Sequence, residues 1–178
     1  MSSDIASIKA FGEATLGAAL DQEEWQDTRV RLSNAAGYIA DGLTETCWEG
    51  TLSSILNRRS DNLTRAELTA AARRVRFENG LTTADVVVGT PIRPLFEEEP
   101  GRYATAVIDG SVVYWRPGAT SEKRGSDPAW MYAAVLHELL HNLGFWDDDI
   151  QKALGLPLDP LDTDDISRAL ATRCFGPA

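Results

Sequence analysis

Residues 137–147 read HELLHNLGFWD, a segment with two histidines four residues apart and a glutamate directly after the first. Residues four apart lie on one face of an α-helix, so both imidazoles can reach one metal ion. Glu138 lies beside that face, where a carboxylate can take a proton from water without being a ligand. The pattern is typical of metal hydrolases in which His137 and His141 would hold Zn²⁺ through neutral nitrogen atoms.

The scarcity of histidine strengthens this interpretation. The chain has 178 residues and only two histidines, and both belong to the motif. Chance placement would produce this pattern in about 1 of 1,000 chains of the same composition. The alternative is a pair of helix histidines that are satisfied by hydrogen bonds alone.

A third ligand is expected just beyond the helix. Gly144 can adopt the left-handed conformation that ends a helix and reverses the chain. Asp147 then becomes an oxygen ligand, and a solvent-filled fourth position would complete a catalytic tetrahedral site. Asp148 and Asp149 compete for the same role, although the offset from Gly144 favours Asp147.

The sequence around the motif predicts further elements. Asp127 and Pro128 are typical of an N-cap and a first helical position, so a helix is expected over 128–143. Asp109-Gly110 lies between two β-rich runs and predicts a hairpin. A last short helix is expected after Asp162 or Thr163, with Ile166 and Leu170 on one face.

Residues 1–83 are expected to be mainly helical. Apolar residues recur at helical spacing between Ile5 and Ile39, and a capping-box pattern at Thr64 opens a helix expected to end at Asn79-Gly80. Residues 84–178 would supply the sheet, the motif helix and the C-terminal helix. There, Asp85 to Val88 predict a short buried strand, and Glu97 to Glu99 a solvated loop.

Composition excludes two classes of partner. A net charge of −10 argues against nucleic-acid binding, because phosphate contacts need clustered Lys and Arg. No apolar stretch approaches the ~20 residues of a bilayer span, so no membrane association is expected.

The compartment stays open: the chain is cytoplasmic as it stands, or exported after trimming. Cys47 and Cys174 either form one disulfide or remain two reduced core cysteines.

The motif resembles that of the metzincin metallopeptidases, HExxHxxGxxH, with aspartate in place of the third histidine as in snapalysin-type small neutral proteases. The resemblance covers roughly residues 104–170, with a detailed match over 137–147. It implies Zn²⁺ bound by His137, His141 and Asp147, and Glu138 as general base. It also implies a single zincin-like α+β domain over 1–178, with a small mixed sheet and an edge strand that pairs with an extended peptide.

The chain departs from that family in one respect. Metzincins place a methionine turn under the metal, whereas Met1 and Met131 both precede the third ligand here. Leu154 or Leu156 would form the apolar floor instead, and no tyrosine follows Tyr132 to stabilise an oxyanion.

Two functions follow from these patterns. The first is a monomeric zinc metallopeptidase acting on peptides or proteins, with Trp146 as a possible wall of the substrate pocket. The alternative is a non-catalytic interaction module with a structural metal site.

Overall fold

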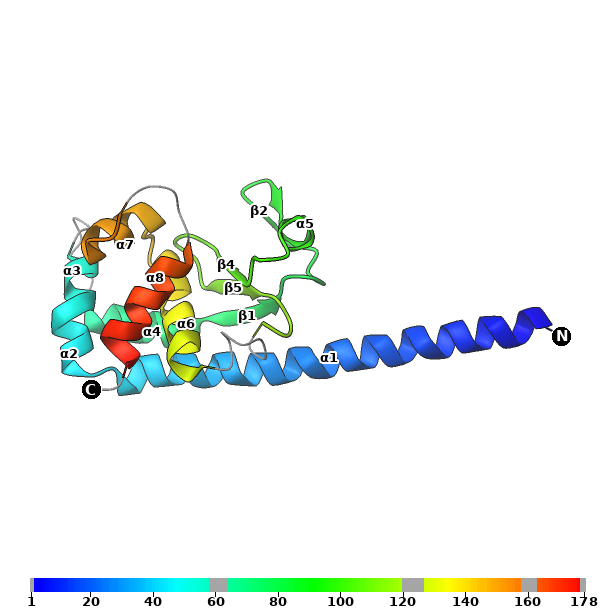
Figure 1. The fold of residues 1–178 in the computed structure, drawn as a ribbon. Helices are drawn as coiled ribbons and strands as arrows, with labels where there is room; N and C mark the ends of the chain where they lie inside the picture. Colours follow the sequence, from blue (N-terminus) through cyan, green and yellow to red (C-terminus); the bar gives the residue numbers. More distant parts are fainter. Residues whose placement is uncertain (1, 58–63, 120–126, 158–162, 177–178) are drawn as a thin grey trace.

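The computed structural model describes residues 2–57, 64–119, 127–157 and 163–176, which form helices and two small sheets, an α+β arrangement (Figure 1). The helices are α1 Ser2–Gly42, α2 Glu45–Cys47, α3 Ser53–Leu56, α4 Arg65–Arg74, α5 Ile92–Glu98, α6 Pro128–Asn142, α7 Asp147–Leu154 and α8 Thr163–Leu170, with π-helical turns η1 Trp48–Leu52 and η2 Ala171–Phe175. The strands are β1 Arg76–Asn79, β2 Val86–Val87, β3 Thr90–Pro91, β4 Ala104–Ala106 and β5 Val112–Trp115.

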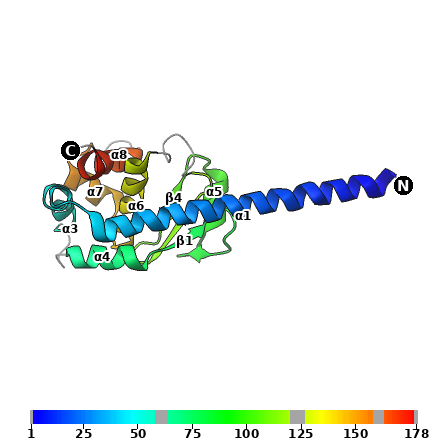
Figure 2. The same ribbon diagram turned by 90° about the horizontal axis from the view of Figure 1, so that it is seen from below.

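Helix α1 is the longest of the described elements, and its C-terminal half packs against the rest of the chain. That half contacts α4 and α6, and Leu32, Ala36 and Ile39 are buried there at helical spacing. The N-terminal half extends away from all other elements in both views (Figures 1 and 2). Among the described residues, no helix combines the length and the apolar character that crossing a membrane requires.

The main sheet has the strand order β1-β5-β4. Strand β1 runs parallel to β5, with Phe77 opposite Val113, and β4 runs antiparallel to β5, with Thr105 opposite Tyr114. The hairpin predicted at Asp109-Gly110 is therefore confirmed. It leaves β4 at the edge of this sheet, beside α6 (Figure 1).

The predicted helix over 64–79 is wrong over its last residues, 75–79. The capping box of Thr64 and Glu67 opens α4 as expected, but the helix ends at Arg74 and residues 76–79 form β1. Phe77 is buried between less buried neighbours, the alternation of a strand. Pairing with β5, more than 30 residues away in sequence, provides the hydrogen bonds that a longer helix would otherwise have made.

The short strand predicted over 85–88 is present as β2, but its predicted burial is wrong. Val86 and Val87 pair only with the two residues of β3, and Val86 is exposed. Val88 is 99% exposed and has a positive φ of 50° in the turn that follows. A valine run can therefore lie at the surface when no second layer covers it.

Glu97 and Glu98 lie in a helix rather than in the predicted loop. Helix α5 forms because Ile92 and Phe96, four residues apart, are both buried on one face. Arg93 pairs with Glu97 on the exposed side of the same helix at 2.7 Å. Only Glu99 follows the helix.

Helices from both halves of the chain pack against α6: α1 and α4 from the first half, and α8 with η2 from the second. Ile166 and Leu170 are fully buried on α8, as predicted, while Asp162 lies outside the described residues. Cys47 of α2 and Cys174 of η2 form a disulfide, which is one of the two alternatives that the sequence leaves open. This bond joins α2 to η2, and η2 packs against α6.

Candidate metal centre

Helix α6 positions both histidines and ends at the glycine that the sequence singles out. The Asp127 side chain accepts a hydrogen bond from the Ala129 N–H at 3.0 Å, so the helix begins where the N-cap signal predicts. At the other end Gly144 has φ 86°. Its N–H donates to His141 O at 2.8 Å, and the Phe145 N–H donates to Leu140 O at 3.0 Å. These two bonds form a Schellman motif, which reverses the chain.

The reversal brings Asp147 to the two histidines. Asp147 begins α7, and its Oδ1 lies 2.8 Å from His137 Nε2 and 3.2 Å from His141 Nε2. Ligand atoms around a tetrahedral zinc ion lie about 3.3 Å apart. One ligand atom from each of the three residues falls within 4.8 Å of the others, a spacing that fits one ion.

The competing aspartates lie elsewhere. Asp148 is exposed, and its carboxylate lies 3.9 Å from Lys152 Nζ. Asp149 is not part of the ligand cluster. Of the three aspartates after Gly144, the structure therefore brings Asp147 to the histidines, as the offset predicts.

The second nitrogen of each ring has its own partner. His141 Nδ1 lies 2.7 Å from Phe145 O, so its N–H donates to that carbonyl, and Nε2 faces Asp147. His137 Nδ1 lies 3.4 Å from Ser167 Oγ on α8, and that hydroxyl lies 3.1 Å from Tyr103 Oη. Such partners fix the ring orientation at metal sites.

Sequence reasoning missed Ser167 and Tyr103. No spacing pattern connects either residue to the motif, because three separate segments meet there only in the folded chain. The sequence suggests Leu154 or Leu156 as the apolar residue beneath the metal. In the structure Leu154 is buried in the main core, and the Ser167 hydroxyl contacts His137.

The side chains of the cluster shift one another's pKa values. Burial alone would lower the pKa of His141, but the hydrogen bond to Asp147 and the charge of Glu138 outweigh burial and raise it to about 9. Burial alone would raise the pKa of Asp147, but the hydrogen bonds with His137 and His141 hold it well below its usual range. The three side chains thus form a tightly coupled group in which Asp147 stays ionised.

The environment of Glu138 differs from that of the three candidate ligands. It is 5% exposed, and its Oε2 has no hydrogen-bond partner among the described residues. Burial raises the pKa of this carboxyl, the charges of His141 and His137 lower it, and the net shift is upward. A buried carboxyl with a raised pKa and a free oxygen is suited to accept a proton.

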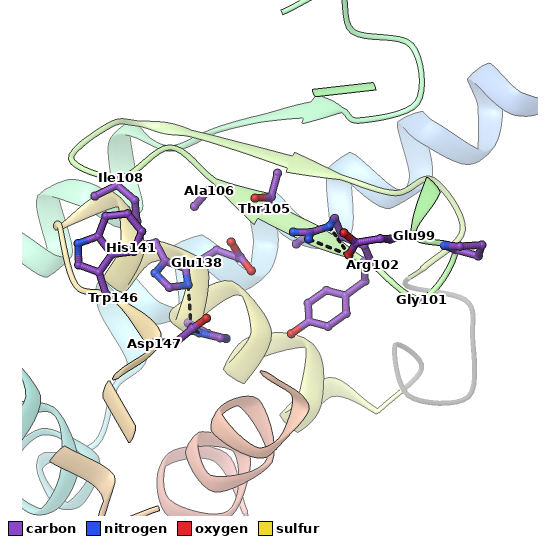
Figure 3. Close-up of a pocket in the computed structure, with 14 residues that line it drawn as sticks. Glu99, Gly101, Arg102, Thr105, Ala106, Ile108, Glu138, His141, Trp146 and Asp147 are labelled. Carbon is purple, nitrogen blue, oxygen red and sulfur yellow. Dashed lines mark hydrogen bonds and ion pairs between the residues drawn. The ribbon is translucent and has the colours of Figure 1, made fainter. Parts of the chain in front are cut away.

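All four residues line one cavity of about 600 Å³. Its other wall is the segment 99–108, which includes edge strand β4. Figure 3 shows Trp146 and Ile108 at one end of this cavity and Arg102 with Glu99 at the other, with Glu138 between them. Trp146 is 63% exposed, so it forms part of the cavity mouth.

Ligand cluster, glutamate and cavity therefore belong to one site on α6, its C-terminal turn and the start of α7. Comparison of the chain with protein-family models, with curated proteins and with solved structures finds no match.

Proposed function

We propose that this protein is a zinc-dependent metallopeptidase in which His137, His141 and Asp147 hold the metal and Glu138 is the general base. The observation that carries the proposal is the convergence of three ligand atoms and the unpartnered Glu138 oxygen on one cavity. Two histidine nitrogens and one carboxylate oxygen are a donor set typical of catalytic zinc, which keeps a fourth position for water or substrate.

Glu138 would transfer a proton from the attacking water to the leaving amine. Bound zinc would polarise the scissile carbonyl and acidify the attacking water. Glu138 Oε2 would accept the proton of that water and later donate it to the leaving amine. The raised pKa of Glu138 supports this role, because it makes the carboxylate a stronger base toward the attacking water.

Edge strand β4 is the proposed docking site for the substrate backbone. The Arg116 N–H donates to Tyr103 O, and the Val107 N–H donates to Val112 O, so alternate residues of this strand face β5. Ala104 and Ala106 then turn their backbone N–H and C=O groups to the open edge. An extended peptide can pair with them and lie across the ligand cluster, an arrangement that supports a zincin-like fold.

Metal analysis and peptide cleavage test the proposal together. We expect about one zinc per chain, cleavage of some members of a quenched peptide library, and loss of both in His141→Ala. Glu138→Ala should keep the zinc and lose cleavage. Asp147→Ala should weaken zinc binding, whereas Asp148→Ala, its exposed neighbour, should not.

Two results would contradict the mechanism: an intact Glu138→Ala activity, or a wild-type chain that binds no zinc. Zinc binding without cleavage of any peptide would support the alternative, a structural metal site in an interaction module.

A further inference from the structure

One arginine side chain lies at one end of the cavity. Among the described residues that line it, Arg102 is the only lysine or arginine. Its side chain is 31% exposed, so the guanidinium reaches both the cavity and solvent. Figure 3 shows Arg102 on the opposite side of Glu138 from Trp146.

The backbone around this arginine is held in place by a second arginine, Arg116. Arg116 Nε donates to Arg102 O at 2.9 Å, and Arg116 Nη2 donates to Glu99 O at 3.1 Å and to Phe96 O. Arg116 directly follows β5, so these bonds tie the cavity end to the sheet. Arg102 is therefore presented from a fixed position rather than from a free loop.

Arg102 already binds a carboxylate that another carboxylate can replace. Its Nε and Nη2 donate to Glu99 Oε2 at 3.1 and 2.8 Å. Glu99 is 56% exposed, and exposed ion pairs of this kind contribute little net stability. Displacing Glu99 would cost little, while a carboxylate at the cavity end could use both N–H groups of the fork.

The direction of β4 indicates which part of a peptide reaches this arginine. The strand runs from Ala104 to Ala106, away from Arg102. A peptide paired antiparallel, the more stable mode, therefore runs with its C-terminal half toward Arg102. Arg102 precedes Ala106 by four residues, about 13 Å of strand.

We propose that Arg102 binds a carboxylate of the substrate on the C-terminal side of the scissile bond. The inference rests on the proposed peptidase function and names its substrate class: peptides with an acidic side chain or a free terminal carboxylate within about four residues after the cleavage point. The Arg102 guanidinium can bind either a side-chain carboxylate or a terminal carboxylate, and the experiment below distinguishes the two.

Cleavage rates test the preference. Quenched peptides would carry Asp or Asn at each of the four positions after the cleavage point, with either an amidated or a free C-terminus. For the zinc-loaded wild type we expect kcat/KM to be about 10-fold higher for the carboxylate-bearing peptides. Arg102→Gln should abolish that difference between carboxylate-bearing and neutral peptides, whereas its effect on the pKa of Glu138, which the Arg102 charge lowers, would act on all peptides alike.

Arg93→Gln is the matched control, because Arg93 also pairs with a glutamate on an exposed surface but does not line the cavity. It should keep the preference. A preference confined to Asp peptides identifies the side chain as the source, and one confined to free C-termini identifies the terminal carboxylate. Equal rates for all peptides with wild type, or an equal loss on all peptides with Arg102→Gln, would overturn the proposal.

Binding to the inactive Glu138→Gln protein gives a readout that does not need turnover. Carboxylate peptides should bind this protein about 10-fold more tightly than neutral ones, and adding Arg102→Gln should remove the difference. Glu99→Gln should tighten binding, because the internal competitor is gone. If wild type cleaves nothing while this carboxylate-dependent binding holds, the peptidase function fails and the Arg102 site stands; equal binding of all peptides overturns the site.

Discussion

Ser167 Oγ lies 3.4 Å from Nδ1 of His137, although 30 residues separate them in sequence. The hydroxyl is buried and also contacts Tyr103 Oη at 3.1 Å. Helix α8 thereby contacts Nδ1 of the first histidine, whereas Asp147 contacts its Nε2.

The contact predicts a role for Ser167 in metal affinity. Loss of a partner that orients a ligand ring typically weakens metal binding 10- to 100-fold. We expect Ser167→Ala to lower zinc affinity about 10-fold in a chelator competition assay. Thr172→Ala removes an exposed hydroxyl that donates to Arg168 O in the preceding helical turn and should leave zinc affinity unchanged. Equal affinities for both variants and wild type would contradict the role.

The part of the site that the sequence predicts depends on local signals. The spacing of His137 and His141, the N-cap at Asp127 and the reversal at Gly144 all act within one helix and its ends. They therefore predict α6 correctly, together with the approach of Asp147 to the two histidines. The edge hairpin at Asp109-Gly110 is local in the same way.

The parts of the fold and of the site that the sequence did not predict depend on contacts between distant segments. Strand β1 replaces the end of a predicted helix because β5 offers a partner for Phe77 and its neighbours. Ser167 and Tyr103 join the site through packing of α8 and β4 against α6. No residue pattern in one segment encodes such a meeting, so sequence reasoning could not find it.

Zinc binding should release a proton near neutral pH. An ordinary histidine titrates near pH 6.5, but pairing with Asp147 raises the pKa of His141 to about 9. Metal-free protein therefore carries a proton on His141 at pH 7.5, and the ligand must lose it. We expect release of about one proton, and zinc affinity that rises about tenfold per pH unit from 7 to 8 and levels off above about 9.

Calorimetry in two buffers of different ionisation heat measures the released proton directly. Wild-type protein should show a buffer-dependent heat of zinc binding at pH 7.5. Asp148→Ala should match it, because that aspartate does not contact the histidines. An affinity that is flat between pH 7 and 8 would contradict the coupling.

The disulfide should account for a large share of stability. Cys47 and Cys174 are 127 residues apart in sequence, and closing a loop of this size is worth about 4–5 kcal/mol in the chain-entropy model. Cys47→Ser with Cys174→Ser should lower the free energy of unfolding by about that amount in urea titrations. Mass spectrometry under non-reducing conditions should find no free thiol in the native protein. Two alkylated cysteines without reductant would show that the bond does not form.

Trp146 should contribute to substrate binding rather than to folding. It is exposed at the cavity mouth, and although it precedes α7 as the N-cap residue, its side chain makes no capping hydrogen bond. Trp146→Ala should raise KM about 10-fold for peptides with a large apolar residue before the cleavage point, and leave zinc content unchanged. Val88→Ala, another exposed apolar position, should change neither. An unchanged KM for every peptide would remove Trp146 from the site.

Gly144 provides a direct test of how the chain reversal builds the metal centre. Its φ of 86° lies in the left-handed region, where a side chain costs about 1–2 kcal/mol. Gly144→Ala should therefore lower the free energy of unfolding by about that amount and also weaken zinc binding, because the turn carries Asp147. Gly37→Ala is the matched control: Gly37 lies exposed in α1, and a methyl group there meets nothing within 4 Å. That change should stabilise the protein by about 0.5–1 kcal/mol, as alanine does in a helix interior, without affecting zinc. If both alanine variants bound zinc as tightly as wild type, the left-handed turn would not be what positions the third ligand.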